Sequence, residues 1–207
     1  MSAAPVAEEI RPLVDALARG DEEAAEKAAT DLLQKGPASL KVLLPLLDSP
    51  DPDLRWWVLR ALGEIPHPRA LTSLLHALRA PEPEIRQCAA LGLRHHAQTG
   101  LDEAEASQAV AALTPLLGEE DRLLASLARD ALTALGEPAV PALLETLQNG
   151  SPAARLEAMR ALAAIGDQRA IPAMFAAITE DDTALLQHWA EEGLEKMGVG
   201  MMFFKPS

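Results

Sequence analysis

The sequence is poor in cysteine, in aromatic side chains and in positive charge. Cys88 is the single cysteine, which excludes an intramolecular disulfide and favours a reducing compartment. Aromatic residues make up 3% of the chain and tyrosine is absent, so few residues are available to wall an aromatic ligand site. The chain carries 18 basic and 31 acidic residues, a formal net charge of −13. This charge opposes long-range attraction to nucleic acid or to an anionic membrane surface.

Long apolar runs are missing as well. No window approaches the roughly 18 consecutive apolar residues of a membrane-spanning helix. The first twenty residues contain acids where a secretory signal has a basic segment followed by an apolar one. We therefore expect a cytoplasmic protein that does not contact a membrane. With 207 residues, 49% of them hydrophobic, the chain is long enough to bury a substantial core.

An internal repeat is the strongest pattern that the sequence does contain. The stretch LRWWVLRALGEI at 54–65 returns as ARLEAMRALAAI at 154–165. Shorter steps connect these copies, because the positions equivalent to Arg55 recur at spacings of 30, 31, 39 and 30 residues. These positions are Ala25, Arg55, Arg86, Ala125 and Arg155. A period of this length is typical of solenoid proteins, and the long spacing indicates an insertion near 97–109 that we expect to lengthen a turn.

Each repeat holds two stretches with helical periodicity. Apolar residues recur every three or four positions in 54–65, as they do on one face of a helix, and the leucines of 71–78 follow the same spacing. Glycine and proline mark the turns within and between these pairs. Helices of about twelve residues are marginal alone, so each pair must be stabilised by stacking on the next.

The repeat resembles a known family. The pattern L-R-x-x-V/A-x-R-A-L-x-x-I, a Gly/Pro turn and then R-A-I/L-x-x-L/M is similar to the HEAT repeat, in the bacterial subtype named after phycobilisome lyases. The resemblance covers roughly residues 21–197 and implies an all-α fold, a right-handed α-α superhelix of five helix pairs that forms a single HEAT-like domain. The expected units are 21–49, 50–80, 81–118, 119–149 and 150–180, with capping helices at 6–19 and 182–197 and an apolar tail at 198–207.

The residue types that usually carry chemistry do not form a recognisable site. Cys88 lies in an alanine-rich helix without a basic neighbour, so we expect an inert core residue. His95 and His96 end a predicted helix, where imidazolium suits the helix dipole. The His-Glu dipeptides of HEAT-like di-iron hydroxylases are missing. We expect no catalytic residue, no bound metal and no cofactor, and therefore a protein that is not an enzyme.

Three groups of residues are candidates for partner binding. Trp56 and Arg60 belong to the types that are enriched in binding hot spots, although packing between repeats also explains the tryptophan pair. The second helices of a HEAT array usually line its concave side, where Thr72, His76 and Arg79 would meet a partner. The tail residues Phe203 and Phe204 would either cover the last helix or mediate docking to a second molecule, including self-association.

These candidates lead to a functional prediction with one alternative. We predict a non-enzymatic scaffold or adaptor that binds a protein partner, such as a peptide, helix or domain, on its concave face. That face lacks the row of basic residues that nucleic acid requires, so no nucleic-acid partner is expected. The alternative follows from the resemblance to phycobilin lyase subunits, which implies the handling of a linear tetrapyrrole, usually as half of a heterodimer, or a regulatory role in an enzyme complex.

Overall fold

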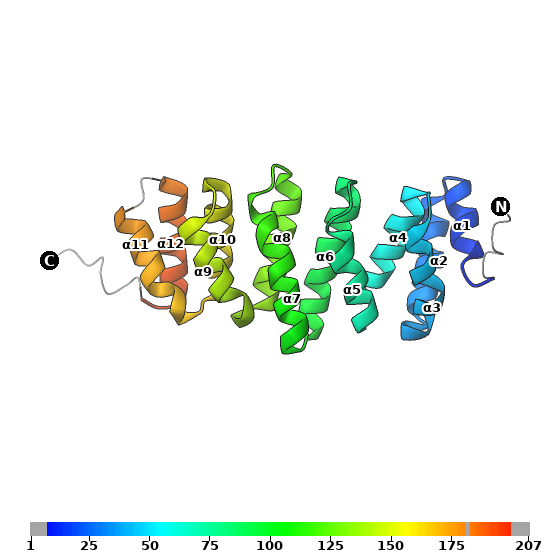
Figure 1. Ribbon diagram of the computed structural model, residues 1–207, viewed down its shortest axis with the longest axis horizontal. Helices are drawn as coiled ribbons and strands as arrows, with labels where there is room; N and C mark the ends of the chain where they lie inside the picture. Colours follow the sequence, from blue (N-terminus) through cyan, green and yellow to red (C-terminus); the bar gives the residue numbers. More distant parts are fainter. Residues whose placement is uncertain (1–7, 181–182, 200–207) are drawn as a thin grey trace. The chain divides into compact units, whose positions relative to one another are not determined.

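The computed structural model describes residues 8–180 and 183–199. Within these ranges every regular element is an α-helix or a short 3-10 helix, which confirms the predicted all-α fold (Figure 1). The chain forms two compact units, Met1–Thr99 and Gly100–Ser207. The predicted boundaries of the individual repeats stay a prediction. The tail residues Phe203 and Phe204 lie outside the described residues.

The first unit contains six α-helices among its described residues. These are α1 (Arg11–Ala18), α2 (Glu22–Leu33), α3 (Leu40–Leu43), α4 (Pro52–Gly63), α5 (Pro68–Ala77) and α6 (Pro83–Thr99), with 3-10 segments at Gly36–Ser39 and Leu44–Asp48. Short polar side chains start several of them, since the first amides of a helix lack partners within it. The carboxylate of Asp21 accepts a hydrogen bond from the amide of Ala24 at 3.0 Å, and Asp51 caps α4 in the same way.

One predicted helix is shorter than its sequence pattern suggests. The apolar spacing from Leu40 to Leu47 predicts a continuous second helix for the first pair, but α3 ends at Leu43 and a 3-10 segment follows. Pro45 explains the change, because proline has no amide proton and cannot donate to the carbonyl of Lys41. The same break occurs in the second unit, where α7 is followed by the 3-10 segment Thr114–Gly118 that contains Pro115.

The insertion near 97–109 does not form the long turn that the sequence suggested. Helix α6 continues to Thr99, and the next helix, α7, already begins at Glu103, so that only Gly100–Asp102 separate them. A reciprocal cap fixes this start: the Asp102 carboxylate accepts from the Glu105 amide at 2.8 Å, and the Glu105 carboxylate accepts from the Asp102 amide at 3.1 Å. The inserted residues therefore extend helices instead of a loop.

The described part of the second unit contains six further α-helices. They are α7 (Glu103–Leu113), α8 (Arg122–Leu135), α9 (Val140–Asn149), α10 (Pro152–Ile165), α11 (Ile171–Glu180) and α12 (Ala184–Lys196), with 3-10 segments at Thr114–Gly118, Glu137–Ala139 and Gln168–Ala170. Helix α10 packs against α8, α9 and α12. Its residues Ala158, Met159 and Leu162 are fully buried at these contacts.

A row of polar contacts joins three helices of this second unit. Glu157 on α10 accepts hydrogen bonds from Arg129 on α8 at 2.7 Å and from Arg160 on α10 at 3.2 Å. The guanidinium of Arg160 in turn lies 4.9 Å from the ring centroid of Trp189 on α12. The repeat arginine is replaced by Ala125, and Arg129 supplies a cation from the next turn of the same helix.

Candidate functional site

The predicted partner-binding residues of the first unit lie at two different hollows. His76 and Arg79 line a pocket between α4 and α5, while Trp56 and Arg60 line another hollow between α2 and α4. Thr72 is exposed on α5 and lines neither of these two. Its hydroxyl donates to the carbonyl of Pro68 at 2.9 Å, a bond within its own helix. Residues that the sequence suggested as candidates for partner binding thus line both hollows.

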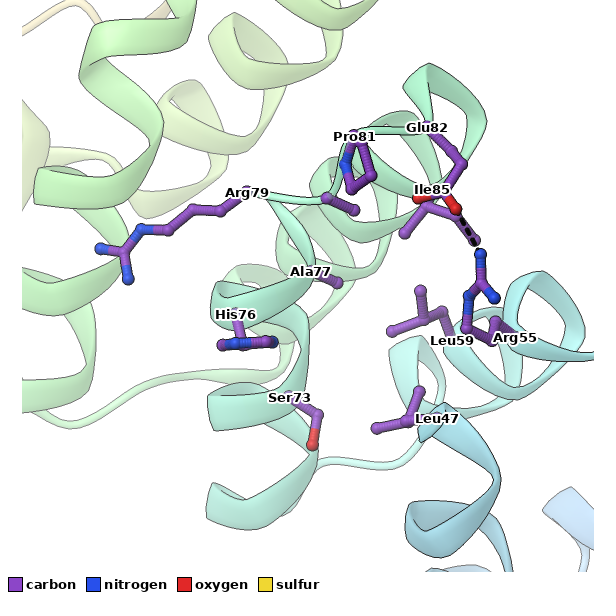
Figure 2. A pocket seen from close by; sticks show the side chains of 11 residues that line it. Leu47, Arg55, Leu59, Ser73, His76, Ala77, Arg79, Pro81, Glu82 and Ile85 are labelled. Atoms are coloured by element: carbon purple, nitrogen blue, oxygen red, sulfur yellow. Dashed lines mark hydrogen bonds and ion pairs between the residues drawn. The ribbon is translucent and has the colours of Figure 1, made fainter. Parts of the chain in front are cut away.

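The first hollow, here called the His76 pocket, has a volume of about 400 Å³ (Figure 2). The segment before α4, α4 itself, α5 and the start of α6 all contribute to it. Its lining consists of Leu47, Arg55, Leu59, Ser73, His76, Ala77, Arg79, Ala80, Pro81, Glu82 and Ile85. Leu59 and Ile85 are buried and give the pocket an apolar wall. The size lies within the range of small-molecule sites in proteins.

The charged side chains beside this apolar wall differ in whether a carboxylate of the protein pairs with them. Arg55 forms an ion pair with Glu82 and also donates to the carbonyl oxygen of Ser49 at 2.8 Å. Figure 2 shows that this pair lies on one side of the pocket and that the Arg79 side chain extends away from it. Arg79 and His76 are exposed and, among the described residues, no ion pair involves either of them. The charge of Arg55 is therefore balanced within the protein, whereas Arg79 is available to an anionic ligand.

The second hollow, here called the tryptophan hollow, has a volume of about 660 Å³. Its lining is Leu17, Gly20, Asp21, Glu22, Glu23, Glu26, Asp53, Trp56, Trp57 and Arg60. Trp57 is 9% exposed and Trp56 is half-buried, which confirms the burial that the helical register predicts. Most carboxylates of this hollow come from the start of α2. The sequence pattern did not predict that this segment lies beside the tryptophans.

Cys88 is a buried thiol below the tryptophan pair. Its Sγ lies 3.8 Å from the backbone carbonyl oxygen of Trp56. Burial raises the pKa of the Cys88 thiol to about 12, and the nearby positive charge of Arg60 offsets only part of this effect. The predicted core position of Cys88 is confirmed by its 7% exposure, and a protonated, buried thiol is a poor nucleophile.

His96 has a structural role that the sequence did not reveal. The sequence placed it at the end of a helix, but α6 continues to Thr99 and the side chain is 1% exposed. Its Nε2 donates to the carbonyl oxygen of Leu62 at 3.1 Å. Leu62 belongs to the last turn of α4, and its carbonyl also accepts from the amide of Ile65, just beyond the helix, at 3.2 Å. His96 therefore caps the neighbouring helix α4 and not its own.

Within residues 8–180 and 183–199 there is no group of three His, Cys, Asp or Glu side chains that would hold a metal ion. None of the helices in these ranges combines the length and the apolar composition that crossing a bilayer demands.

The repeat structure agrees with the comparison to known families. HEAT repeats match two stretches of the chain, residues 10–94 and 110–195. The chain belongs to the HEAT-repeat family. This HEAT-repeat protein therefore has the solenoid class of fold that its sequence pattern indicates.

Two curated relatives match parts of this HEAT-repeat protein. A phycobilisome maturation protein of Synechococcus elongatus is 34% identical over 101 residues, which cover 49% of this chain and 49% of that protein. The bilin biosynthesis protein RpcF of Synechococcus sp. (strain WH8020) is 37% identical over 87 residues, or 42% of each chain. The matched region spans about half the length of the curated relatives.

Solved structures show the same fold at low sequence identity. The complex of CpcE and CpcF of phycocyanin lyase from Nostoc sp. PCC7120 aligns with a TM-score of 0.51 and 19% identity, over 95% of this chain and 79% of that chain. A designed armadillo repeat protein in complex with the peptide (KR)4 aligns with a TM-score of 0.54 and 18% identity, over 94% of this chain and all of that chain. Both similarities concern the fold.

The relatives correct the functional prediction made from the sequence. The expected non-enzymatic scaffold or adaptor is wrong, because both curated relatives are named for phycobilisome maturation or bilin biosynthesis. The same names do not support the expectation that the chain is not an enzyme. They favour the alternative, a bilin lyase-like subunit. The scaffold prediction failed because a HEAT solenoid has the same periodic core whatever ligand its surface binds.

Proposed function

We propose that this HEAT-repeat protein is a bilin lyase-like subunit that takes part in the maturation of a bilin-carrying protein. The observation that carries the proposal is the pair of curated relatives, which are 34% and 37% identical to it over 101 and 87 residues. Because these matches cover about half of each relative, the activity and the substrate remain part of the proposal. In this role the chain acts within an enzyme complex, together with a second protein subunit.

The His76 pocket is our candidate for the site that holds the bilin. A linear tetrapyrrole combines an extended apolar ring system with two propionate carboxylates. Leu47, Leu59 and Ile85 offer the ring system an apolar surface. Arg79 extends away from the pocket (Figure 2), so it would meet a propionate outside the apolar wall with a charge-assisted hydrogen bond, and His76 offers a second donor. A pocket of about 400 Å³ accommodates part of such a molecule, and the rest extends along the solvent-exposed side.

The chain's contribution would be to bind and orient the bilin, without a covalent bond to its own thiol. Cys88 is 7% exposed, and burial raises the pKa of its thiol to about 12. A covalent adduct requires the thiolate and access to the tetrapyrrole, and both are missing at this position. Residues that hold a carboxylate, such as Arg79, would instead fix the orientation of the tetrapyrrole relative to an acceptor protein.

Binding of biliverdin to the purified chain tests the pocket. We expect a red-shifted absorption band and saturable binding to the wild type. The double variant His76→Gln/Arg79→Gln should weaken binding about 10-fold, the loss expected for one or two charge-assisted hydrogen bonds. Arg122→Gln removes one exposed positive charge from α8 and serves as the control, with a change below about 2-fold.

Two results would contradict this proposal. If biliverdin dimethyl ester, which lacks free carboxylates, binds as tightly as biliverdin, the roles of Arg79 and His76 are wrong. If neither compound binds, and co-expression with bilin synthesis and phycobiliprotein subunits gives no additional coloured acceptor, the bilin-related function itself is wrong.

A further inference from the structure

The tryptophan hollow contains a guanidinium group enclosed by aromatic rings and a carboxylate. The rings of Trp56 and Trp57 meet edge to face, with centroids 5.2 Å apart and planes at 87°. The guanidinium carbon of Arg60 lies 5.0 Å from the Trp57 centroid and 5.7 Å from the Trp56 centroid. Glu26 on α2 accepts a hydrogen bond from Arg60 at 2.7 Å. This arrangement is a site that already holds one arginine side chain.

The hollow carries far more negative than positive charge. Glu26 is joined along its rim by four further carboxylates, and Arg60 is the one basic residue in its lining. These four carboxylates belong to Asp21, Glu22, Glu23 and Asp53, all of them exposed. Asp21 caps α2 with its side chain, whereas Glu22, Glu23 and Asp53 form no ion pair within the described residues. One guanidinium thus faces four carboxylates besides the helix cap Asp21, which leaves the hollow attractive to a second cation.

Arg60 is held by interactions that are weak enough to be exchanged. Its side chain is 44% exposed and that of Glu26 is 61% exposed. Ion pairs and cation–π contacts between groups as exposed as these contribute little stabilisation. An arginine from another molecule could therefore replace Arg60 at the rings at little energetic cost, while Arg60 turns toward water.

We propose that the tryptophan hollow docks a basic segment of a partner protein, with an arginine side chain of that segment stacked on Trp56 and paired with the carboxylates from α2. Charge complementarity selects this occupant, because nucleic acid and anionic membranes would meet the acidic rim with like charge. The hollow and the His76 pocket use different side chains of α4, so this proposal goes beyond the bilin-related function and does not depend on it.

Competition between Arg60 and an incoming arginine gives the sharpest test. The probe is an acetylated and amidated hexa-arginine peptide, titrated calorimetrically into the full chain at an ionic strength of about 0.15 M. Arg60→Met removes the resident guanidinium and should strengthen binding about 3- to 10-fold, because the rings and Glu26 become available. Arg122→Met removes the same charge from an exposed position on α8 and should change the affinity by less than about 2-fold.

A variant that removes a carboxylate of the hollow provides a second test, because it should weaken binding. Glu26→Gln should weaken hexa-arginine binding about 3- to 10-fold, whereas Glu191→Gln, an exposed position on α12, should leave it within about 2-fold of the wild type. Glu26 is exposed, so a thermal melt should show that its variant remains folded. The proposal is overturned if Arg60→Met and Arg122→Met change the affinity equally, if Arg60→Met weakens binding, or if the wild type does not bind the peptide.

Discussion

Gly63 on α4 and Gly92 on α6 bring these two helices into backbone contact. A Cβ atom on Gly63 would lie 2.9 Å from the Cα of Gly92, a separation that carbon atoms do not tolerate without movement. A Cβ on Gly92 would in addition lie 3.0 Å from a methyl group of Leu74 on α5. The glycine pair therefore sets the distance between α4 and α6, and α4 carries side chains of both hollows.

Gly63→Ala should destabilise the protein despite alanine's better helix propensity. Alanine would contribute about 0.5–1 kcal/mol through propensity, but overpacking of a close contact costs about 1–3 kcal/mol. We expect a net decrease of about 1–2 kcal/mol in the free energy of unfolding, measured by urea denaturation. Leu91→Ala, one residue before Gly92 and 46% exposed, should change it by less than about 0.5 kcal/mol. A stabilised Gly63→Ala protein would show that the helices separate easily.

His96→Leu should reveal the cost of removing the cap from α4. The substitution keeps an apolar group in a buried position but leaves the Leu62 carbonyl without the imidazole donor. Because the Ile65 amide still donates to this carbonyl at 3.2 Å, the loss should be about 0.5–1.5 kcal/mol in the free energy of unfolding, the contribution of one hydrogen bond. His95→Leu is the matched control, since His95 is half-buried and its Nε2 lies 3.7 Å from a Glu64 oxygen. Equal effects of the two substitutions would contradict the capping role.

Glu157→Gln should weaken the second unit more than a surface carboxylate does. The Glu157 and Arg129 side chains are only 10% and 14% exposed, so neutralising Glu157 leaves a poorly hydrated arginine that keeps Asp130, at 2.8 Å, as its carboxylate partner. Breaking a buried pair costs about 3–5 kcal/mol when the remaining charge has no partner, and because Asp130 still pairs with Arg129 we expect about 1–2 kcal/mol here. Glu192→Gln breaks the more exposed pair with Lys196 and should cost below about 1 kcal/mol. Chemical denaturation of both variants measures the difference.

The Cys88 thiol should remain protonated in the folded protein far above its usual pH range. Its pKa is raised by burial to about 12, whereas a thiol in the unfolded chain titrates near ~8.5. The folded state therefore keeps its proton longer, and the stability that this burial contributes is complete below about pH 8.5 and is lost as the pH rises toward 12. Labelling with a thiol-reactive disulfide at about pH 8.5 should be slow without urea and fast in urea. Fast labelling of the folded chain would contradict the buried position.

Much of the fold could be predicted from local patterns. The apolar spacing of 54–65 and 71–78 indicated two helices, and these correspond to α4 and α5. The burial of Trp57 and Cys88 followed from the same register. These predictions succeeded because periodicity depends on residues close together in the sequence. The short α3 was missed because the effect of Pro45 overrides the apolar pattern around it.

The contacts that the sequence did not predict join residues that are far apart along the chain. Arg60 meets Glu26, and His96 meets the carbonyl of Leu62, each across 34 positions. Neither Glu26 nor the backbone of Leu62 stands out in a single sequence, because an acid near a helix start and a leucine in a core are both common. The functional prediction failed for a related reason: the repeat pattern records the packing between helices and contains no information about the ligand.

The shared carboxylate of Glu157 has a consequence for how the second unit comes apart. Glu157 binds both Arg129 and Arg160, and Arg160 lies over the ring of Trp189 on helix α12. Detachment of α12 would therefore remove the aromatic partner of Arg160, which stays on α10. We therefore expect fraying at this end to affect α8 and α10 as well. Hydrogen exchange in the three helices should consequently rise together and not in sequence from the C-terminal side.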